Sequence, residues 1–222
     1  MIDKMIFLCI IGASPSYGRI YKGRVNPVMF CTIAIFVASN IAYLLIINQL
    51  EKENKALESQ ALYDGLTGLP NRRLFLDRLN LKISHAKRYN EKVGVIFMDL
   101  DGFKAVNDQY GHNAGDEVLR VVAGRINECT RESDTVARFG GDEFAIILPE
   151  VGDQIQVSEI ASRLITSINE PIWFKGNEIH VGTSIGICFY PANGAECQEL
   201  VNAADQAMYG AKNSGKNCFK LA

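Results

Sequence analysis

The sequence predicts an α/β (α+β) sandwich with antiparallel strands at its centre, preceded by one long apolar helix. Three observations predict this fold class. Residues 28–47 carry no charge, strand-like and helical patterns alternate after residue 60, and a Gly-Gly turn joins two strand-like runs within that alternation. The composition agrees, because 48% hydrophobic and 22% charged residues describe a globular chain rather than a disordered or collagen-like one.

Charge and cysteine content exclude two broad classes. The chain has 23 Lys and Arg against 25 Asp and Glu, so no global basic field exists for non-specific nucleic-acid binding, and we expect no nucleic-acid partner. The six cysteines lie far apart and form no CxxC pair, which argues against a zinc ribbon and a dense disulfide framework. We expect reduced, mostly buried thiols.

The chain is predicted to have four parts. Residues 1–26 form a short N-terminal segment, 27–50 a transmembrane helix, 51–63 a helical linker and 64–222 the folded domain. A helix needs ~20 apolar residues to cross the core of a bilayer, so 27–50 predicts a single membrane pass. The alternatives are a buried core helix or an uncleaved signal-like segment. Met5–Ala13 is apolar but too short to span alone, and it resembles a signal-peptide core or part of a second membrane segment.

The linker has the pattern of a helix that continues the membrane helix. It combines recurring leucines with charged pairs at helical spacing, such as Glu51 and Lys55. A short parallel coiled coil through this segment is one way to pair two chains. The basic residues that flank the apolar run are Arg19, Lys22 and Arg24 before it and Lys52 and Lys55 after it, so a simple positive-inside count places the folded domain outside the cytoplasm.

Periodicity after residue 70 predicts four helices and five strand-like runs. The helices are expected at 71–90, 114–132, 157–169 and 196–212, and the strands at 93–100, 134–139, 143–149, 171–173 and 179–190.

Acidic residues gather where one buried strand ends. The continuous apolar run Val93–Leu100 (VGVIFMDL) predicts this strand. Asp99 lies near the end of the strand but still inside it, and Asp101 lies just beyond. Open α/β sheets place their ligands at such strand ends. Asp101 could instead cap the short helix that follows, whereas Asp99 is less suited to capping because it is still inside the strand.

A second acidic group follows the Gly-Gly turn in Arg138–Phe144 (RFGGDEF). Two glycines permit a tight turn and a close approach of the backbone to a ligand. Asp142 and Glu143 are adjacent, so on a strand they point to opposite faces. If this hairpin lies beside the strand that carries Asp99, then Asp99 and Asp142 can chelate one hard divalent cation, which is the pattern of Mg²⁺.

These segments carry a family resemblance. Arg138–Phe144 contains the letters GGDEF, and three other segments fit the same family in order and spacing: Asp64–Arg73 (DGLTGLPNRR), Asp99–Asp116 (DLDGFKAVNDQYGHNAGD) and Ala207–Asn217 (AMYGAKNSGKN). Over residues 61–222 the chain resembles the GGDEF-domain diguanylate cyclases, which make cyclic di-GMP from two GTP molecules with release of pyrophosphate. The resemblance implies a fold similar to the nucleotidyl cyclase and polymerase palm domain.

The resemblance implies roles for the acidic residues. Asp99, Asp142 and Glu143 match the family's metal carboxylates, and Leu100 matches a main-chain carbonyl ligand, so Mg²⁺ is the implied cofactor, with Mn²⁺ as an alternative. Asp142 and Glu143 are the implied catalytic residues. Glu143 matches a residue proposed either to help deprotonate the 3′-hydroxyl or to bind a second metal, and both roles stay open here.

The resemblance also implies a GTP site. Asn107 and Asp116 match the guanine-reading pair, in which a carboxylate accepts from the N1–H and N2–H₂ edge that adenine lacks. Many relatives carry Arg where this chain has Lys216, and a Lys there loses bidentate geometry. The residues implied to approach the phosphates are Phe103, Lys104, Gly140, Gly141, Lys212 and Lys216.

A short charged motif implies feedback by the product. Arg131–Asp134 (RESD) matches the family's RxxD inhibitory motif at its usual offset, with five residues between it and Gly140. Arg131 and Asp134 would bind the guanine edges and phosphates of cyclic di-GMP. An arginine can donate two parallel hydrogen bonds either to a guanine edge or to a phosphate. Arg163 is a candidate second arginine of that inhibitory site.

We therefore expect a membrane-tethered diguanylate cyclase that acts as a homodimer in bacterial second-messenger signalling. Its GTP substrate is cytoplasmic, so the catalytic domain is expected on the cytoplasmic side of the inner membrane, against the simple positive-inside count. One alternative is a degenerate GGDEF domain that binds GTP or cyclic di-GMP and regulates a partner without catalysis. A polymerase-like nucleotidyltransferase is disfavoured by the near-neutral charge.

Overall fold

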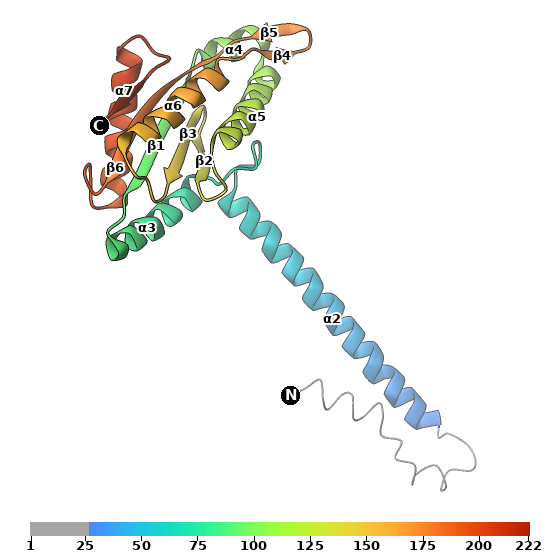
Figure 1. Ribbon diagram of the computed structural model, residues 1–222. Coiled ribbons are helices and arrows are strands. Elements are labelled where there is room, and N and C mark those ends of the chain that lie inside the picture. The colour runs from blue at the N-terminus through green and yellow to red at the C-terminus, as the bar shows by residue number, and fades with distance from the viewer. Residues whose placement is uncertain (1–26) are drawn as a thin grey trace. The chain divides into compact units, whose positions relative to one another are not determined.

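The computed structural model describes residues 27–222, which divide into two units between residues 57 and 58 (Figure 1). The predictions for residues 1–26, including the apolar stretch Met5–Ala13, lie outside the described residues.

Helix α2 covers both the predicted membrane helix and the predicted linker. It runs without a break from Pro27 to Leu62. Within it, Cys31–Glu53 is long and apolar enough to cross a membrane, with a mean hydropathy of 2.0, and none of its most apolar window is buried. A core helix of a soluble protein would be mostly buried, whereas a signal sequence near the N-terminus has the same length and composition. This segment is therefore a candidate membrane span by length and composition.

The second unit is built on a five-stranded sheet in the order β2-β3-β1-β6-β7. Its neighbouring strands are antiparallel except for the parallel pair β6 and β7. Helices flank this mainly antiparallel sheet, which confirms the predicted fold class. The bounds are β1 Val93–Asp101, β2 Thr135–Gly140, β3 Glu143–Leu148, β6 Gly182–Tyr190 and β7 Phe219–Leu221.

Each face of the sheet has its own apolar core, because successive side chains of a strand point to opposite faces. Val95 and Phe97 of β1 pack in the core under α3 (Arg72–Tyr89) and α7 (Cys197–Asn213). Ile96 and Met98 pack in the core on the other face, which three helices cover (Figure 1). These are α4 (Phe103–Tyr110), α5 (His112–Cys129) and α6 (Gln154–Ile168).

Side chains at the helix starts explain where three of these helices begin. Asn71 accepts a hydrogen bond from the N–H of Leu74 at the start of α3, and Asp153 accepts one from Gln156 at the start of α6. Helix α7 begins with a reciprocal capping box between Glu196 and Glu199. Such caps satisfy N–H groups that have no partner inside the helix.

Some predicted element bounds are wrong. The expected strand 179–190 is two elements: β5 (Asn177–Ile179) pairs with β4 (Ile172–Phe174) in a separate hairpin, and β6 begins only at Gly182. Helix α5 ends at Cys129 rather than at residue 132. The short strand β7 was not predicted, because three residues in a parallel pairing leave no periodic pattern.

Candidate active site

The two predicted acidic groups meet at one end of the sheet. Strand β1 pairs with β3 so that Asp99 lies directly opposite Glu143. Alternation along each strand places Asp99 on the same face as Phe97, and Glu143 on the same face as Ala145, and both of those neighbours lie in the core under α7. Both side chains are half-buried. The two carboxylates therefore share one face of the sheet, beside helix α7.

The Gly-Gly turn places Asp142 next to this pair. Gly141 has a φ of 54°, a left-handed conformation that favours glycine. The register between β2 and β3 shifts between Arg138 and Gly140, as in a β-bulge. The N–H of Leu100 donates to the carbonyl of Asp142 at 3.2 Å, which fastens the turn to β1. Asp142 thus sits at the tip of the hairpin, adjacent to the end of β1.

Helix α7 contributes a cation to this face. The Nζ atom of Lys212 lies 2.7 Å from Oδ2 of Asp99, and both side chains are largely shielded from water. The helix lies close to the sheet because Gly186 of β6 contacts the α7 backbone at Ala204, where a Cβ would leave no space. A glycine at this point of β6 therefore helps to bring Lys212 over the acidic residues.

The pKa values of the group reflect burial and, after it, concentrated negative charge. Burial raises the pKa of Asp99, and the carboxylates of Asp142 and Asp101 act in the same direction, against the effect of Lys212. Burial also raises the pKa of Glu143, with further contributions from Asp99, Asp205 and Asp142. Burial disfavours the charged form of Lys212. The hydrogen bond from Lys212 to Asp99 outweighs this effect, so the pKa of Lys212 is raised. Excess carboxylate held in this way is what a divalent cation would relieve.

The donor set fits a hard cation. Asp99, Asp142 and Glu143 offer carboxylate oxygens within electrostatic reach of one another, and oxygen is the ligand that Mg²⁺ and Mn²⁺ prefer. In residues 27–222 no three His, Cys, Asp or Glu side chains lie close enough together to hold a metal ion by themselves, Asp99, Asp142 and Glu143 included. Mg²⁺ usually binds through one or two carboxylates together with water and substrate phosphates, so a cation here would need ligands from the substrate as well.

The predicted guanine-reading residues lie on the helix pair that follows β1. Asn107 is on α4 and Asp116 is in the first turns of α5, and both are half-buried. Gly115 packs directly against the side-chain amide of Asn107, so a Cβ at residue 115 would overlap it. The sequence did not single out this contact of Gly115, because a glycine inside a helix carries no pattern of its own.

The four residues predicted to approach the phosphates from α4 and from the end of α7 differ in accessibility. Phe103 is buried in the core, so only its backbone can face a ligand, whereas Lys104 is exposed in the first turn of α4. Lys212 points to Asp99. Lys216 is exposed and lies past the end of α7 in a left-handed backbone conformation, so it does not share a helix face with Lys212.

The Lys216 turn is nevertheless fixed to the end of β1. The N–H of Asn217 donates to Asp101 at 3.0 Å, and the hydroxyl of Ser184 donates to the same carboxylate at 3.0 and 2.9 Å. Asp101 therefore does not cap α4, whose N-cap is Gly102 with no side-chain hydrogen bond. The capping alternative for Asp101 is wrong because its oxygens are engaged by β6 and the turn before β7.

The predicted inhibitory residues gather after the far end of α5. The N–H of Arg131 donates to Asp134 at 2.7 Å, which closes a tight turn. The guanidinium of Arg163 on α6 donates to the carbonyl of Cys129 at 2.7 Å, so it lies beside the start of the same turn. From Asp116 to Cys129 the helix rises about 20 Å. This cluster is therefore well separated from the guanine-reading residues.

Comparison with known proteins agrees with this arrangement. The family described as "Diguanylate cyclase, GGDEF domain" matches residues 61–218. The chain belongs to the GGDEF family. Domains of this family generally use a divalent metal, which agrees with the donor set around Asp99.

Several relatives of this GGDEF domain are named as diguanylate cyclases. The bifunctional diguanylate cyclase/cyclic di-GMP phosphodiesterase MucR of Pseudomonas aeruginosa is 44% identical over 177 residues, which are 79% of this chain and 26% of MucR. The diguanylate cyclase TpbB of the same organism is 41% identical over 175 residues, 78% of this chain and 40% of TpbB. The chain thus spans less than half the length of these relatives.

Solved structures have the same fold. The GGDEF domain of TpbB superposes with a TM-score of 0.71 at 41% identity, covering 72% of this chain and 94% of that one. The coiled coil and GGDEF domain of DgcB from Caulobacter crescentus, in complex with c-di-GMP, gives a TM-score of 0.78 at 25% identity, covering 84% and 99%.

Proposed function

We propose that this GGDEF domain is a catalytically competent diguanylate cyclase that condenses two GTP molecules into cyclic di-GMP and pyrophosphate. The observation that carries the proposal is the intact set of Asp99, Asp142 and Glu143 at one end of the sheet, facing Lys212. Buried charge of this kind is costly to keep, which supports a working site for a metal and a nucleotide.

Each residue has a chemical task in this reaction. Asp99, Asp142 and Glu143, with the carbonyl of Leu100, would hold Mg²⁺ or Mn²⁺, which supplies charge neutralisation at the triphosphate when bound. Glu143, whose raised pKa favours proton uptake, is suited to accept the proton of the attacking 3′-hydroxyl. Lys212 can turn from Asp99 to the triphosphate, since its flexible stem carries a single mobile charge.

The substrate is held by groups around this centre. Asn107 and Asp116 would read the guanine edge, and Lys104 and Lys216 would meet the phosphates with the backbone of Phe103, Gly140 and Gly141. The 3′-oxygen of one GTP attacks the α-phosphorus of the other, and pyrophosphate leaves. Two such steps close the ring, so two domains must face each other as a homodimer.

Regulation and location complete the proposal. Arg131, Asp134 and Arg163 would bind the product at the end of α5 and slow the enzyme. This idea gains support from the DgcB structure, which was determined with c-di-GMP. Cys31–Glu53 would cross the inner membrane once and keep the domain in the cytoplasm, where GTP is available.

The direct test uses the full chain purified in detergent with GTP and Mg²⁺, analysed by product chromatography. We expect cyclic di-GMP and pyrophosphate in a ratio of one to two, and no product when Mg²⁺ is chelated. Binding of GTP or cyclic di-GMP without turnover would instead favour the non-catalytic regulator. That alternative matters because the P. aeruginosa protein named cyclic di-GMP phosphodiesterase NbdA is also 36% identical over 172 residues.

A further inference from the structure

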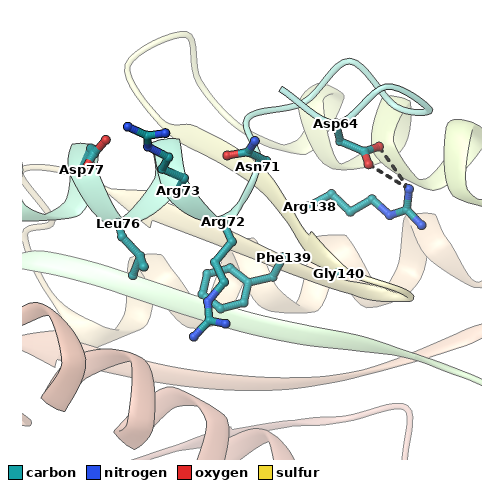
Figure 2. A pocket seen from close by; sticks show the side chains of 9 residues that line it. All are labelled: Asp64, Asn71, Arg72, Arg73, Leu76, Asp77, Arg138, Phe139 and Gly140. Carbon is teal, nitrogen blue, oxygen red and sulfur yellow. Dashed lines mark hydrogen bonds and ion pairs between the residues drawn. The ribbon is translucent and has the colours of Figure 1, made fainter. Parts of the chain in front are cut away.

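One arginine outside the predicted site holds the Gly-Gly turn. The guanidinium of Arg138 donates twice to the carbonyl of Gly141, from Nε at 3.0 Å and from Nη2 at 2.7 Å. Its third nitrogen, Nη1, donates to both carboxylate oxygens of Asp64 at 3.1 Å (Figure 2). All three nitrogens of the guanidinium are thus engaged, which fixes the plane of the group.

Asp64 is itself held in a fixed orientation. It accepts hydrogen bonds from the N–H and the hydroxyl of Thr67, at 2.9 and 2.7 Å. Burial acts against its ionisation, but these bonds and Arg138 prevail and lower the pKa of Asp64. The ion pair is well shielded, since the side chains of Arg138 and Asp64 are 14% and 23% exposed. Such a pair is stronger and more rigid than a typical surface ion pair.

The turn around Asp64 is also tied to the last turn of α2. The side chain of Asn71 donates to the carbonyl of Ala61 at 2.9 Å, and its backbone N–H donates to the carbonyl of Leu62 at 2.9 Å. The backbone N–H of Arg138 donates to the carbonyl of Pro70 at 2.9 Å. Hydrogen bonds of Asn71 and of Arg138, joined through the peptide bond between Pro70 and Asn71, therefore link the end of α2 to the turn that carries Asp142.

We propose that Arg138 is a positioning residue that sets the place of Asp142, and that Asp64, two residues beyond the end of α2, orients the Arg138 guanidinium. The proposal rests on the proposed function and names residues that control the same site. Gly141 directly precedes Asp142, and the carbonyl of Asp142 is bound from the other side by Leu100. The hairpin tip is thus held between β1 and the Arg138 guanidinium, so loosening one side displaces the metal-binding carboxylate.

The planar guanidinium of Arg138, which donates to two partners at once, makes the proposal specific to arginine. A lysine at residue 138 could reach either Asp64 or Gly141, but one ammonium cannot reproduce the planar, two-sided contact. An asparagine at residue 64 keeps its size and its contacts with Thr67 but loses the charge that orients Arg138. Arg138→Lys and Asp64→Asn should therefore have the same kind of effect on the hairpin, although residue 64 is far from the hairpin in sequence.

The test compares these two variants with Arg120→Lys in the full chain in detergent. Arg120 is a matched control, because its ion pair with Glu117 on α5 is exposed and distant from the hairpin in sequence. Hydrogen–deuterium exchange without nucleotide or metal reports the hairpin directly. We expect faster exchange at residues 139–144 in both variants and wild-type exchange in the control. Steady-state kinetics should give a kcat lowered by about 10- to 100-fold, with a smaller change in KM for GTP.

Two outcomes would overturn the inference: wild-type exchange at residues 139–144 in Asp64→Asn, or a loss of activity in Arg138→Lys with no change at the hairpin. The exchange experiment does not depend on turnover. If the wild-type chain makes no cyclic di-GMP while both variants loosen the hairpin, the proposed function fails and the coupling from Asp64 to the hairpin stands.

Discussion

Asp99 and Glu143 lie opposite each other across two antiparallel strands and are within electrostatic reach of each other. Like charges directly opposite on a sheet are destabilising. Among residues 27–222, Lys212 forms the ion pair with Asp99, at 2.7 Å. The arrangement therefore stores repulsion that a bound cation and its nucleotide can relieve, and this leads to the first prediction.

Replacing Asp142 by Asn or Glu143 by Gln should abolish cyclic di-GMP synthesis and leave the fold intact. In the proposed reaction each change removes a charge that would act at the reacting phosphates, and the loss should be at least about 100-fold in kcat. Neither side chain belongs to the apolar core, so circular dichroism and the melting midpoint should stay near those of the wild type. Near-wild-type product formation by both variants would contradict the assignment.

Replacing Gly115 by Ala should weaken the selection of GTP over ATP. The new methyl group would overlap the amide of Asn107, which lies at the end of a flexible side chain and can move away. Losing one hydrogen bond to guanine should lower the ratio of kcat/KM for GTP over ATP by about tenfold.

Gly124→Ala is the matched control for this change. Gly124 lies on the same helix, and a Cβ there would have no neighbour within 4 Å. It should therefore keep the selectivity and gain slightly in stability from better helix propensity. Equal selectivity in both variants would show that Gly115 does not position Asn107.

The ion pair of Asp64 and Arg138 predicts a pH dependence of stability. The folded-state pKa of Asp64 is lowered, so the contribution of its ionised form to stability is fully present above the ordinary aspartate pKa of 3.8 and is lost as the pH falls through the folded-state pKa. Asp64→Asn should lower the free energy of unfolding by on the order of 1 to 3 kcal/mol near neutral pH. In urea titrations the difference from wild type should shrink below pH 3.8, and a constant difference would exclude an ionised Asp64 as its source.

The sequence predicted the strand β1, the Gly-Gly hairpin and the helices α3, α6 and α7 because each has a strong period or a clear turn signal. It predicted Asp99 and Asp142 as neighbours because a hairpin beside a buried strand leaves few arrangements. These signals are local, and they suffice for the elements that build the acidic end of the sheet.

The contacts that orient the site were not predictable in the same way. Arg138 was part of a motif, but its bonds to Asp64 and Gly141 depend on segments 74 residues apart meeting in space. Asp101 looked like a helix cap because capping is a local pattern, whereas its real partners, Ser184 and Asn217, are far along the chain. Tertiary hydrogen bonds of this kind have no sequence period.

Replacing Arg131 by Ala should relieve product inhibition without lowering the initial rate. The RESD turn follows α5, about 20 Å along that helix from Asp116, so its loss should not disturb the GTP site. The product concentration at which progress curves flatten should rise by about tenfold or more, because a bidentate arginine contact to guanine is worth about 1 to 3 kcal/mol. A curve that flattens at the wild-type product level would show that this turn is not the inhibitory site.

Pairing of two domains should limit the rate, because each holds only one of the two GTP molecules. Residues 28–62 can supply that pairing, since a membrane anchor and a helical linker raise the effective concentration of one domain near another. A protein that begins near Ser59 keeps nearly all of the second compact unit, which starts at residue 58. It should therefore be soluble and folded, with circular dichroism typical of the sandwich.

The specific activity of this shortened protein should rise steeply with its concentration at micromolar levels and below. The specific activity of the full chain in membranes should not change when the membranes are diluted. The full chain should also sediment with membranes and resist carbonate extraction, because Cys31–Glu53 has the length and hydropathy of a span. A freely soluble full chain would rule out the membrane anchor. If the shortened protein stays monomeric in analytical ultracentrifugation and its specific activity does not change with concentration, the reaction does not need two facing domains.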